Sequence, residues 1–350
     1  MTDSESTVDV SPIDVVVVGA GPVGLACAIA AIRQGLSARV IEKGALVDSL
    51  IGYPTQMELF STPELIEIGG HPFACQGYKP TREEAIDYYR GVARVEALDL
   101  RLYERVERID GEAGAFEVVT TRRDGEPGRH LCRAVIVAVG FFDVPNRLGL
   151  DGEDEPRVTH YYKEPYAYTG QQVAVVGAKN SAAKAALDCY RNGADVTLIH
   201  RGDGLSDRVK YWIRPDLENR IAEGSIRAFF GTTITGIEPG ALRLATPDGE
   251  QVIANDFVLA MTGYRPDYDL LATFGIATHD DAARTPVYDA TTFETNRSGV
   301  YLAGTVCGGL HTGRWFIENG RHHAEQIAHH VAHGAAPEVD LVGRHWKTAE

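Results

Sequence analysis

The sequence predicts an α/β protein with two Rossmann-like dinucleotide-binding domains, the second inserted into a split first one. A buried, β-branched run leads into a glycine-rich loop and then a helix at residues 19–24. The same plan recurs at 177–182, a shift of 158 residues. The chain of 350 residues is long enough for two domains of ordinary size.

The first unit is a complete series of strand, loop, helix and strand. The run IDVVVV at 13–18 predicts a buried parallel strand, and GAGPVG at 19–24 is a full G-x-G-x-x-G loop. A second strand at 38–41 ends at Glu42, which follows Gly19 by 23 residues. A carboxylate that binds a ribose hydroxyl is expected roughly 20 residues after the loop. Backbone N–H groups at the helix N-terminus would hold a pyrophosphate, so this unit predicts a dinucleotide site.

The second unit departs from the pattern within its loop. A strand at 173–176 leads into GAKNSA, where lysine replaces the second glycine. Lysine keeps the loop cationic, and the polar side chains after it add hydrogen bonds for phosphate at the helix N-terminus. The loop residues expected at the cofactor are Gly177, Lys179, Asn180, Ser181 and Ala182.

The strand at 195–199 is not followed by an acid. Instead, a basic cluster follows it: His200, Arg201, Arg208 and Lys210. A carboxylate would repel a 2′-phosphate and arginine attracts it, so this unit predicts NADP(H) rather than NAD. A solvated basic loop is the alternative. Gly263, at the end of the apolar run 257–263, is expected to border the same site.

Further apolar runs that end in glycine complete the domain organisation. VIVAVG at 135–140 and GVYLAG at 299–304 are predicted strands, and a long helix is expected from about Trp315. The returning GVYLAG segment would complete the first domain around the inserted second one. The expected order is FAD-binding domain 1–152, NADPH-binding domain 153–272, second part of the FAD-binding domain 273–335, and a tail 336–350.

Composition excludes several classes of partner. The net charge of −15 disfavours nucleic acid, and no apolar run approaches the roughly 20 residues of a membrane helix. The N-terminus is polar and acidic, unlike a signal peptide. The five cysteines contain no C-x-x-C, which argues against a disulfide framework. A cytoplasmic protein is therefore expected.

The order of these motifs resembles the low-molecular-weight thioredoxin reductase family of FAD/NADPH oxidoreductases. That family carries a C-x-x-C pair that is missing here around Asn180–Leu187, which excludes thioredoxin reduction by that route. Within the superfamily the sequence looks most like the bacillithiol-disulfide (bacilliredoxin) reductases, a resemblance that spans nearly all of residues 13–330. It rests on GYPTQMELFSTPELIEIGGHPF (52–73), KPTREEAIDYYR (79–90), THYYKEPY (159–166), GAKNSA (177–182), MTGYRPDY (261–268) and FIENG (316–320).

The resemblance implies FAD, NADPH and reduction of a low-molecular-weight thiol disulfide or of its mixed disulfide on a small redoxin protein. It also implies a homo-oligomer, a dimer or higher. Thr305, where the wider superfamily has aspartate, is normal for this branch. The FAD-binding residues expected from the motif and the resemblance are Gly19, Ala20, Gly21, Pro22, Val23, Gly24, Glu42, Lys43, Gln56, Gly140, Gly304 and Thr305.

One departure concerns thiol chemistry. The resembled family typically has a cysteine as the fifth residue of its fingerprint, where this sequence has Val23. Cys27, one helical turn later, and Cys307, after GVYLAGTV, are the candidate catalytic relay thiols, with a pKa lowered by a helix N-terminus. The Ala-rich surroundings of Cys27 favour packing for that thiol.

Five histidines crowd the last predicted helix: His322, His323, His329, His330 and His333. Histidines one turn apart can bind a metal, but no cysteine or carboxylate completes an obvious site. A solvated helix face is the favoured interpretation, and no metal is predicted.

Three other functions stay open. A ferredoxin/flavodoxin–NADP reductase also lacks C-x-x-C, but it would need a basic docking patch that the acidic composition disfavours. A flavin monooxygenase is disfavoured because no F-x-G-x-x-x-H-x-x-x-W signature is present. The last alternative is a non-catalytic flavoprotein redox sensor, which steady-state turnover would distinguish from an enzyme.

Overall fold

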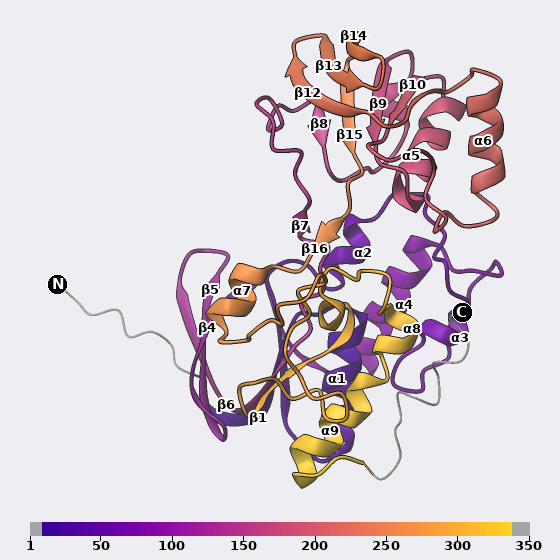
Figure 1. Ribbon diagram of the computed structural model, residues 1–350. Coiled ribbons are helices and arrows are strands. Elements are labelled where there is room, and N and C mark those ends of the chain that lie inside the picture. Colours follow the sequence, from indigo (N-terminus) through magenta and orange to yellow (C-terminus); the bar gives the residue numbers. More distant parts are fainter. Residues whose placement is uncertain (1–8, 338–350) are drawn as a thin grey trace. The chain divides into compact units, whose positions relative to one another are not determined.

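A computed structural model describes residues 9–337, which form two compact units (Figure 1). Unit 1 comprises the described residues up to Ile51, then Met57–Val144, and the described residues from Arg265 onward. Unit 2 comprises Gly52–Gln56 and Pro145–Tyr264. Unit 1 therefore combines indigo N-terminal and yellow C-terminal elements in Figure 1.

The chain crosses between the units at 51/52, 56/57, 144/145 and 264/265. The last two crossings each lie eight residues before the boundaries expected from the sequence, 152/153 and 272/273. The two crossing segments, β7 (Val144–Pro145) and β16 (Tyr264–Arg265), pair as a two-stranded sheet. Most of the predicted tail 336–350 lies outside the described residues. Within the described range, no helix is long and apolar enough to cross a membrane.

Unit 1 is built on a seven-stranded sheet in the order β3-β2-β1-β6-β5-β4, with β17 also paired to β6. The pairings among β3, β2, β1, β6 and β17 are parallel. Strand β5 pairs antiparallel with β6, and β4 pairs antiparallel with β5. Val15, Val16 and Val17 are fully buried, as the continuous β-branched run predicts for a central parallel strand. The strands are β1 (Asp9–Val18), β2 (Ala38–Glu42), β3 (Asp99–Leu102), β4 (Glu104–Glu112), β5 (Ala115–Arg122), β6 (Pro127–Val137) and β17 (Val300–Leu302).

The helices of unit 1 include α1, which follows the first glycine loop and lies beside α9 (Figure 1). Gly35, just beyond α1, has φ +80°, the left-handed conformation typical of a helix end. The capping box of Thr81 and Glu84 starts α4. The helices are α1 (Pro22–Arg33), α2 (Asp48–Gly52, ending in unit 2), α3 (Pro63–Ile66), α4 (Arg82–Val95), α7 (Tyr268–Thr273), α8 (Ile317–Gly320), α9 (His323–His333) and the 3₁₀ helix η2 (Gly304–Gly308).

The long helix expected from Trp315 is in fact two helices, α8 and α9, separated by Arg321 and His322. The short α8 has its own start, because the Asn319 side chain accepts a hydrogen bond from the Phe316 N–H. A Cβ on Gly320 would lie 3.1 Å from Cα of Gly304, so α8 packs closely on the turn after β17.

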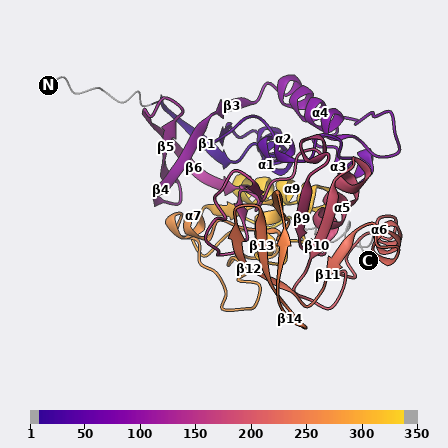
Figure 2. The same ribbon diagram turned by 90° about the horizontal axis from the view of Figure 1, so that it is seen from above.

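Unit 2 is a five-stranded parallel sheet in the order β11-β10-β9-β15-β8, covered on both faces. Val173 and Val175 of β9 pack with the alanines of α5, whereas Ala174 packs with β13. Figures 1 and 2 show α5 and the β12–β14 sheet on opposite sides of this strand. The elements are β8 (Val158–Thr159), β9 (Gln172–Val176), β10 (Asp195–Ile199), β11 (Arg227–Phe229), β12 (Thr233–Glu238), β13 (Ala241–Thr246), β14 (Gly249–Ala254), β15 (Phe257–Ala260), α5 (Asn180–Arg191), α6 (Arg214–Ala222) and the 3₁₀ helix η1 (Tyr166–Tyr168).

Candidate cofactor sites

The three glycines of the first loop, Gly19, Gly21 and Gly24, have different structural roles. Gly19 has φ +106°, and a Cβ there would lie 2.7 Å from the carbonyl oxygen of Ala138. A Cβ on Gly24 would lie 1.9 Å from the carbonyl oxygen of Gly19. Gly21, the N-cap of α1, has no atom within 4 Å of its Cβ position. The fold itself therefore requires Gly19 and Gly24, while Gly21 leaves open the space where a pyrophosphate meets the helix N-terminus.

Glu42 lies at the end of β2 and is 8% exposed. Its carboxylate accepts hydrogen bonds from the Ala20 N–H at 2.8 Å and from the Gly44 N–H at 2.8 Å. Burial raises the pKa of Glu42, and these two hydrogen bonds oppose that rise. The acid expected at a ribose is thus positioned by the glycine loop itself.

The loops after β6 and β17 meet the first glycine loop at the carboxyl edge of the parallel strands. A Cβ on Gly304 would lie 3.2 Å from the Val23 side chain, and one on Gly140 would lie 3.4 Å from Oγ1 of Thr305. Both glycines have positive φ, +69° at Gly140 and +79° at Gly304. Ligands of open α/β sheets bind at this edge, so these segments fit a dinucleotide cofactor.

The two residues assigned to FAD by resemblance differ in position. Lys43 follows Glu42 and forms an ion pair with Asp143 at 2.6 Å, which joins the loops after β2 and β6. Gln56 belongs to unit 2, where its side-chain amide donates to the Tyr166 hydroxyl at 2.5 Å. Its assignment to FAD stays a prediction.

Both candidate relay thiols lie in the core. Cys27 and Cys307 are fully buried, and burial raises the pKa of Cys27 to about 12 and raises that of Cys307 further. The expectation of a lowered pKa at a helix N-terminus does not match these surroundings, because desolvation of the thiolate outweighs the helix end. In this structure neither thiol is positioned as an attacking thiolate.

His323 corrects the expectation of a solvated histidine face. It is fully buried, and its ring centroid lies 4.0 Å from that of Phe293 and 4.3 Å from that of Trp315. Its Nδ1 accepts from the Gly304 N–H at 3.1 Å, and burial lowers its pKa to about 3. This link to the loop after β17 could not be predicted, because the histidine spacing alone does not show which helix face is buried.

The second glycine loop lies in unit 2, between β9 and α5. Gly177 has φ +133°, and a Cβ there would lie 2.5 Å from the carbonyl oxygen of Met261. Lys179 is the exposed N-cap of α5, Ser181 is exposed, and Ala182 is buried against the core. The helix therefore begins at Asn180, two residues before the expected start, and its cap has no side-chain hydrogen bond.

Asn180 fixes the basic loop after β10 to the start of α5. Its side-chain amide donates to the carbonyl oxygen of Arg208 at 3.1 Å, and its Oδ1 accepts from the Lys210 N–H at 2.9 Å. Arg208 and Lys210, which the sequence assigned to the NADPH site, are therefore held by their backbones at the N-terminus of α5.

Lys179, Arg201 and Arg208 place three cationic side chains in this site. Partial burial lowers the pKa of His200, and the charges of Arg201 and Lys179 lower it further. In the described part of the chain, no carboxylate pairs with Lys179, Arg201 or Arg208. Such a cluster at a helix N-terminus fits a phosphate group.

Gly263 also belongs to unit 2, at the carboxyl end of β15. It has φ +87°, and its carbonyl oxygen accepts from the Asn146 N–H at 2.9 Å. The Asn146 side-chain amide donates to the Thr262 carbonyl oxygen at 3.2 Å. Gly177, His200 and Gly263 thus follow the carboxyl ends of three parallel strands.

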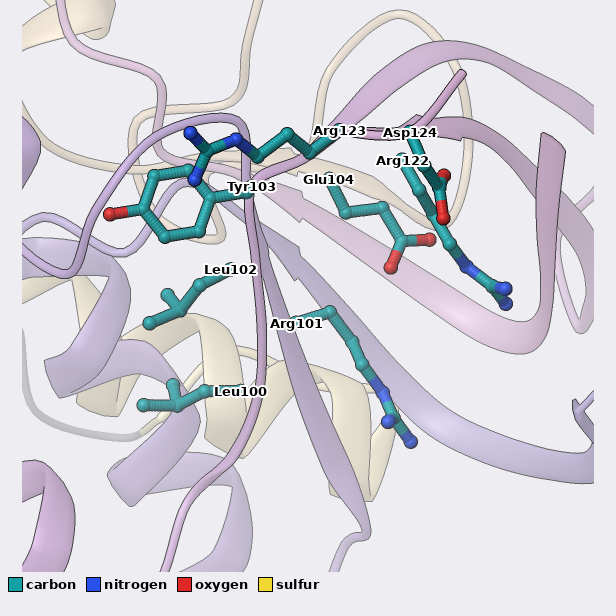
Figure 3. Close-up of a pocket in the computed structure, with 8 residues that line it drawn as sticks. All are labelled: Leu100, Arg101, Leu102, Tyr103, Glu104, Arg122, Arg123 and Asp124. Carbon is teal, nitrogen blue, oxygen red and sulfur yellow. The ribbon is translucent and has the colours of Figure 1, made fainter. Parts of the chain in front are cut away.

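Unit 1 also has an open cleft of about 740 Å³ that no sequence motif signals, lined by residues 100–104 and 122–124 (Figure 3). It lies where β3 turns into β4 and β5 ends. Leu102 is the strand partner of Glu42, so the cleft borders the acid end of the first site.

Comparisons with known proteins agree with this architecture. The family model of pyridine nucleotide-disulphide oxidoreductases matches residues 16–304. Bacilliredoxin reductase Bdr of Bacillus subtilis is 37% identical over 318 residues, which cover 91% of this chain and 97% of that protein. The solved bacillithiol disulfide reductase Bdr (YpdA) of Bacillus cereus has a TM-score of 0.90 at 37% identity, covering 93% of this chain and 100% of that chain. A ferredoxin–NADP reductase of Paracidovorax citrulli is 31% identical over 315 residues, 84% of this chain and 82% of that protein. The chain belongs to the pyridine nucleotide-disulphide oxidoreductase family.

Proposed function

We propose that this chain is a flavoprotein reductase that uses NADPH to reduce the disulfide of a low-molecular-weight thiol, or the mixed disulfide of such a thiol with a small redoxin protein. The observation that carries the proposal is the similarity, over nearly the full length of both proteins, to reductases named for bacilliredoxin and bacillithiol disulfide. One dinucleotide unit has an acid after its second strand and the other has a basic cluster there. Two such units fit a reaction that moves electrons between two different cofactors.

The chain is an oxidoreductase that uses FAD and NADPH. We assign FAD to the loops of unit 1 around Gly21, Glu42, Gly140 and Gly304. The α1 N-terminus would hold its pyrophosphate, and Glu42 would accept from a ribose hydroxyl. When bound, FAD supplies a group that takes two electrons from a nicotinamide and passes them on.

We assign NADPH to unit 2. The N-terminus of α5 and Lys179 would bind its phosphates, and Arg201 and Arg208 would bind the 2′-phosphate that distinguishes it from NADH. The absence of an acid after β10 removes the repulsion that a 2′-phosphate would otherwise meet.

The acceptor disulfide would be reduced without a relay by Cys27 or Cys307, since both thiols are buried and protonated. Val23, which replaces the cysteine typical of the resembled family, packs between Gly304 and Gly320 and supplies no thiol. The balanced reaction is RSSR + NADPH + H⁺ giving 2 RSH and NADP⁺. The two electrons break the S–S bond, and each sulfur leaves with a proton.

The proposed setting is a reducing cytoplasm, in which the five free cysteines are stable as thiols. We also propose a homo-oligomer, as the resemblance implies. Neither assignment affects the chemistry described above.

A ferredoxin–NADP reductase is the second candidate, favoured by the 31% identity to such an enzyme. Such an enzyme would need a basic docking patch for its partner, which the net charge of −15 disfavours.

The test is steady-state NADPH oxidation by the purified flavoprotein with a panel of acceptors: bacillithiol disulfide, a bacillithiol-modified redoxin, oxidised glutathione, thioredoxin and ferredoxin. We expect turnover with one of the first two to exceed that with the others at least tenfold. Slow turnover with every disulfide and fast electron transfer to ferredoxin would instead favour the second candidate. Slow turnover with all of them would favour a redox sensor.

A further inference from the structure

The end of α9 carries two histidines on one face of the helix. His329 and His333 are four residues apart and are neighbours on that face, where His329 is partly exposed and His333 is exposed. Their ring centroids lie 4.6 Å apart, with the ring planes tilted by 52°. Two imidazoles that share a tetrahedral metal ion at the usual Zn–N distance have centroids roughly 5 Å apart. The observed separation is therefore close to that of a chelating pair.

A hydrogen bond fixes which nitrogen of His329 can bind a ligand. Nδ1 of His329 lies 3.1 Å from the carbonyl oxygen of Ala335, just beyond the helix. A carbonyl oxygen can only accept, so Nδ1 carries the proton and Nε2 of the neutral ring carries the lone pair. Histidines that bind metals are commonly held in this way, because they donate their other ring N–H to an oxygen that orients the ring.

The second histidine is oriented by an oxygen from another helix. Nε2 of His333 lies 3.2 Å from Oε1 of Gln34, the C-cap residue of α1, and α1 lies beside α9 (Figure 1). Nε2 donates to this oxygen, so Nδ1 of His333 carries the lone pair. Each ring of the pair therefore uses one nitrogen to fix its orientation and keeps the other for a ligand.

We propose that His329 and His333 together bind a divalent transition-metal ion that favours imidazole nitrogen, such as Zn²⁺ or Ni²⁺. This inference goes beyond the proposed function, because neither histidine belongs to a proposed cofactor site. It also departs from the sequence-based expectation that these histidines form only a solvated helix face.

The proposed site is an open one. Within residues 9–337, no third histidine, cysteine, aspartate or glutamate completes a metal-binding group with this pair. The two imidazoles supply two positions of the ion, and water supplies the rest. Structural zinc sites, by contrast, are closed by four protein ligands.

His330 provides a matched control on the same helix. It follows His329 directly, so its side chain points to a different face of α9. Its Nδ1 lies 2.9 Å from the hydroxyl oxygen of Tyr301, a residue of β17. His330 therefore has the same residue type and nearly the same position along the helix, but it lies outside the proposed site.

The test is isothermal titration of the purified, untagged flavoprotein with NiCl₂. We expect the tightest site to take one Ni²⁺ per chain in wild type and in His330→Gln. Loss of an outer-shell partner alone typically weakens metal binding 10- to 100-fold, so loss of a ligand should weaken it by at least about tenfold in His329→Gln and in His333→Gln. Glutamine is a good helix former, and far-UV circular dichroism and flavin content verify that each variant is folded.

Three results would overturn the inference. Tightest Ni²⁺ binding that is unchanged in both His329→Gln and His333→Gln would show that the site lies elsewhere. A loss in only one of these variants would show that the two histidines do not share an ion, and an equal loss in His330→Gln would show that their common face is not required. None of these results bears on the proposed reductase activity, which is tested separately with the panel of acceptors.

Discussion

Arg201 and Arg208 are the residues whose replacement tests the preference for NADPH. Neither has a carboxylate partner within the described residues, and Arg201 lies close enough to His200 to lower its pKa. Hydrogen bonds to charged groups contribute about 1.5–3 kcal/mol, equivalent to roughly 10- to 100-fold in affinity. Arg201→Ala should therefore raise the KM for NADPH by about that factor and leave the KM for NADH unchanged.

Arg191→Ala is the control for this prediction. Arg191 is an exposed arginine of α5 in the same unit, and it pairs with Asp216. Its replacement should change neither KM. Equal effects of Arg201→Ala on NADPH and NADH would show that the residue does not bind the 2′-phosphate.

His323 predicts part of the pH dependence of stability. Burial lowers the pKa of His323 from 6.5 to about 3. Below pH 6.5 the imidazole is therefore protonated in the unfolded chain but stays neutral in the folded protein. The stability from the neutral imidazole is thus present above pH 6.5 and is lost as the pH falls toward 3. Between pH 6.5 and 5 this single group should lower the free energy of unfolding by up to about 2 kcal/mol.

His323→Gln removes the titration but keeps a neutral side chain that can accept from the Gly304 N–H. Urea unfolding from pH 7 to pH 5 should show a shallower pH dependence in this variant than in wild type. Other titrating groups are common to both proteins, so they cancel in the comparison. Identical slopes would mean that His323 is not buried as a neutral group.

At the scale of the element, the first glycine loop separates folding from binding. A Cβ on Gly24 would meet the Gly19 carbonyl oxygen at 1.9 Å, so Gly24→Ala forces the backbone of the loop and α1 to shift. We expect destabilisation of about 3 kcal/mol or more. Gly21 has φ −71° and open space around its Cβ position, so Gly21→Ala should fold like wild type but lose most of its flavin.

These outcomes are measured by urea denaturation of the flavin-free proteins and by the ratio of flavin to protein after purification. The prediction is contradicted if Gly21→Ala unfolds as easily as Gly24→Ala, or if it keeps a full complement of flavin.

The elements that the sequence predicted well are those with a continuous apolar run next to a glycine. Strand β10 has the expected bounds, Asp195–Ile199, and Glu42 ends β2 as its spacing indicates. Gly19 and Gly24 could be predicted because one needs a positive φ and the other a close backbone approach that other residues resist.

Features that depend on distant packing could not be predicted. Tyr103 adopts a conformation typical of glycine without a glycine to signal it, and the cleft beside it joins two segments about 20 residues apart. His323 shares a helix with exposed histidines, and only the packing of Phe293 and Trp315 shows that it is buried. The relay role of Cys307 was inferred from position along the chain, which does not report desolvation.

At the scale of the whole molecule, the account requires both units but no relay by the buried thiols. Cys27→Ser and Cys307→Ser should each reduce a disulfide acceptor at a rate within about threefold of wild type, because neither thiol is a thiolate near neutral pH. The measurement is steady-state NADPH oxidation at saturating disulfide. A loss of more than tenfold in either variant, with normal flavin content and normal reduction by NADPH, would restore that cysteine as a relay.

The central claim is that unit 1 holds FAD and unit 2 delivers electrons to it from NADPH. The most direct measurement is anaerobic rapid mixing of the purified protein with NADPH or NADH, followed through the visible absorbance of the oxidised flavin. The account predicts a yellow protein that is bleached by stoichiometric NADPH, and at much lower concentrations of NADPH than of NADH. A colourless protein that cannot be reconstituted with FAD, or a yellow one that NADPH does not bleach, would contradict it.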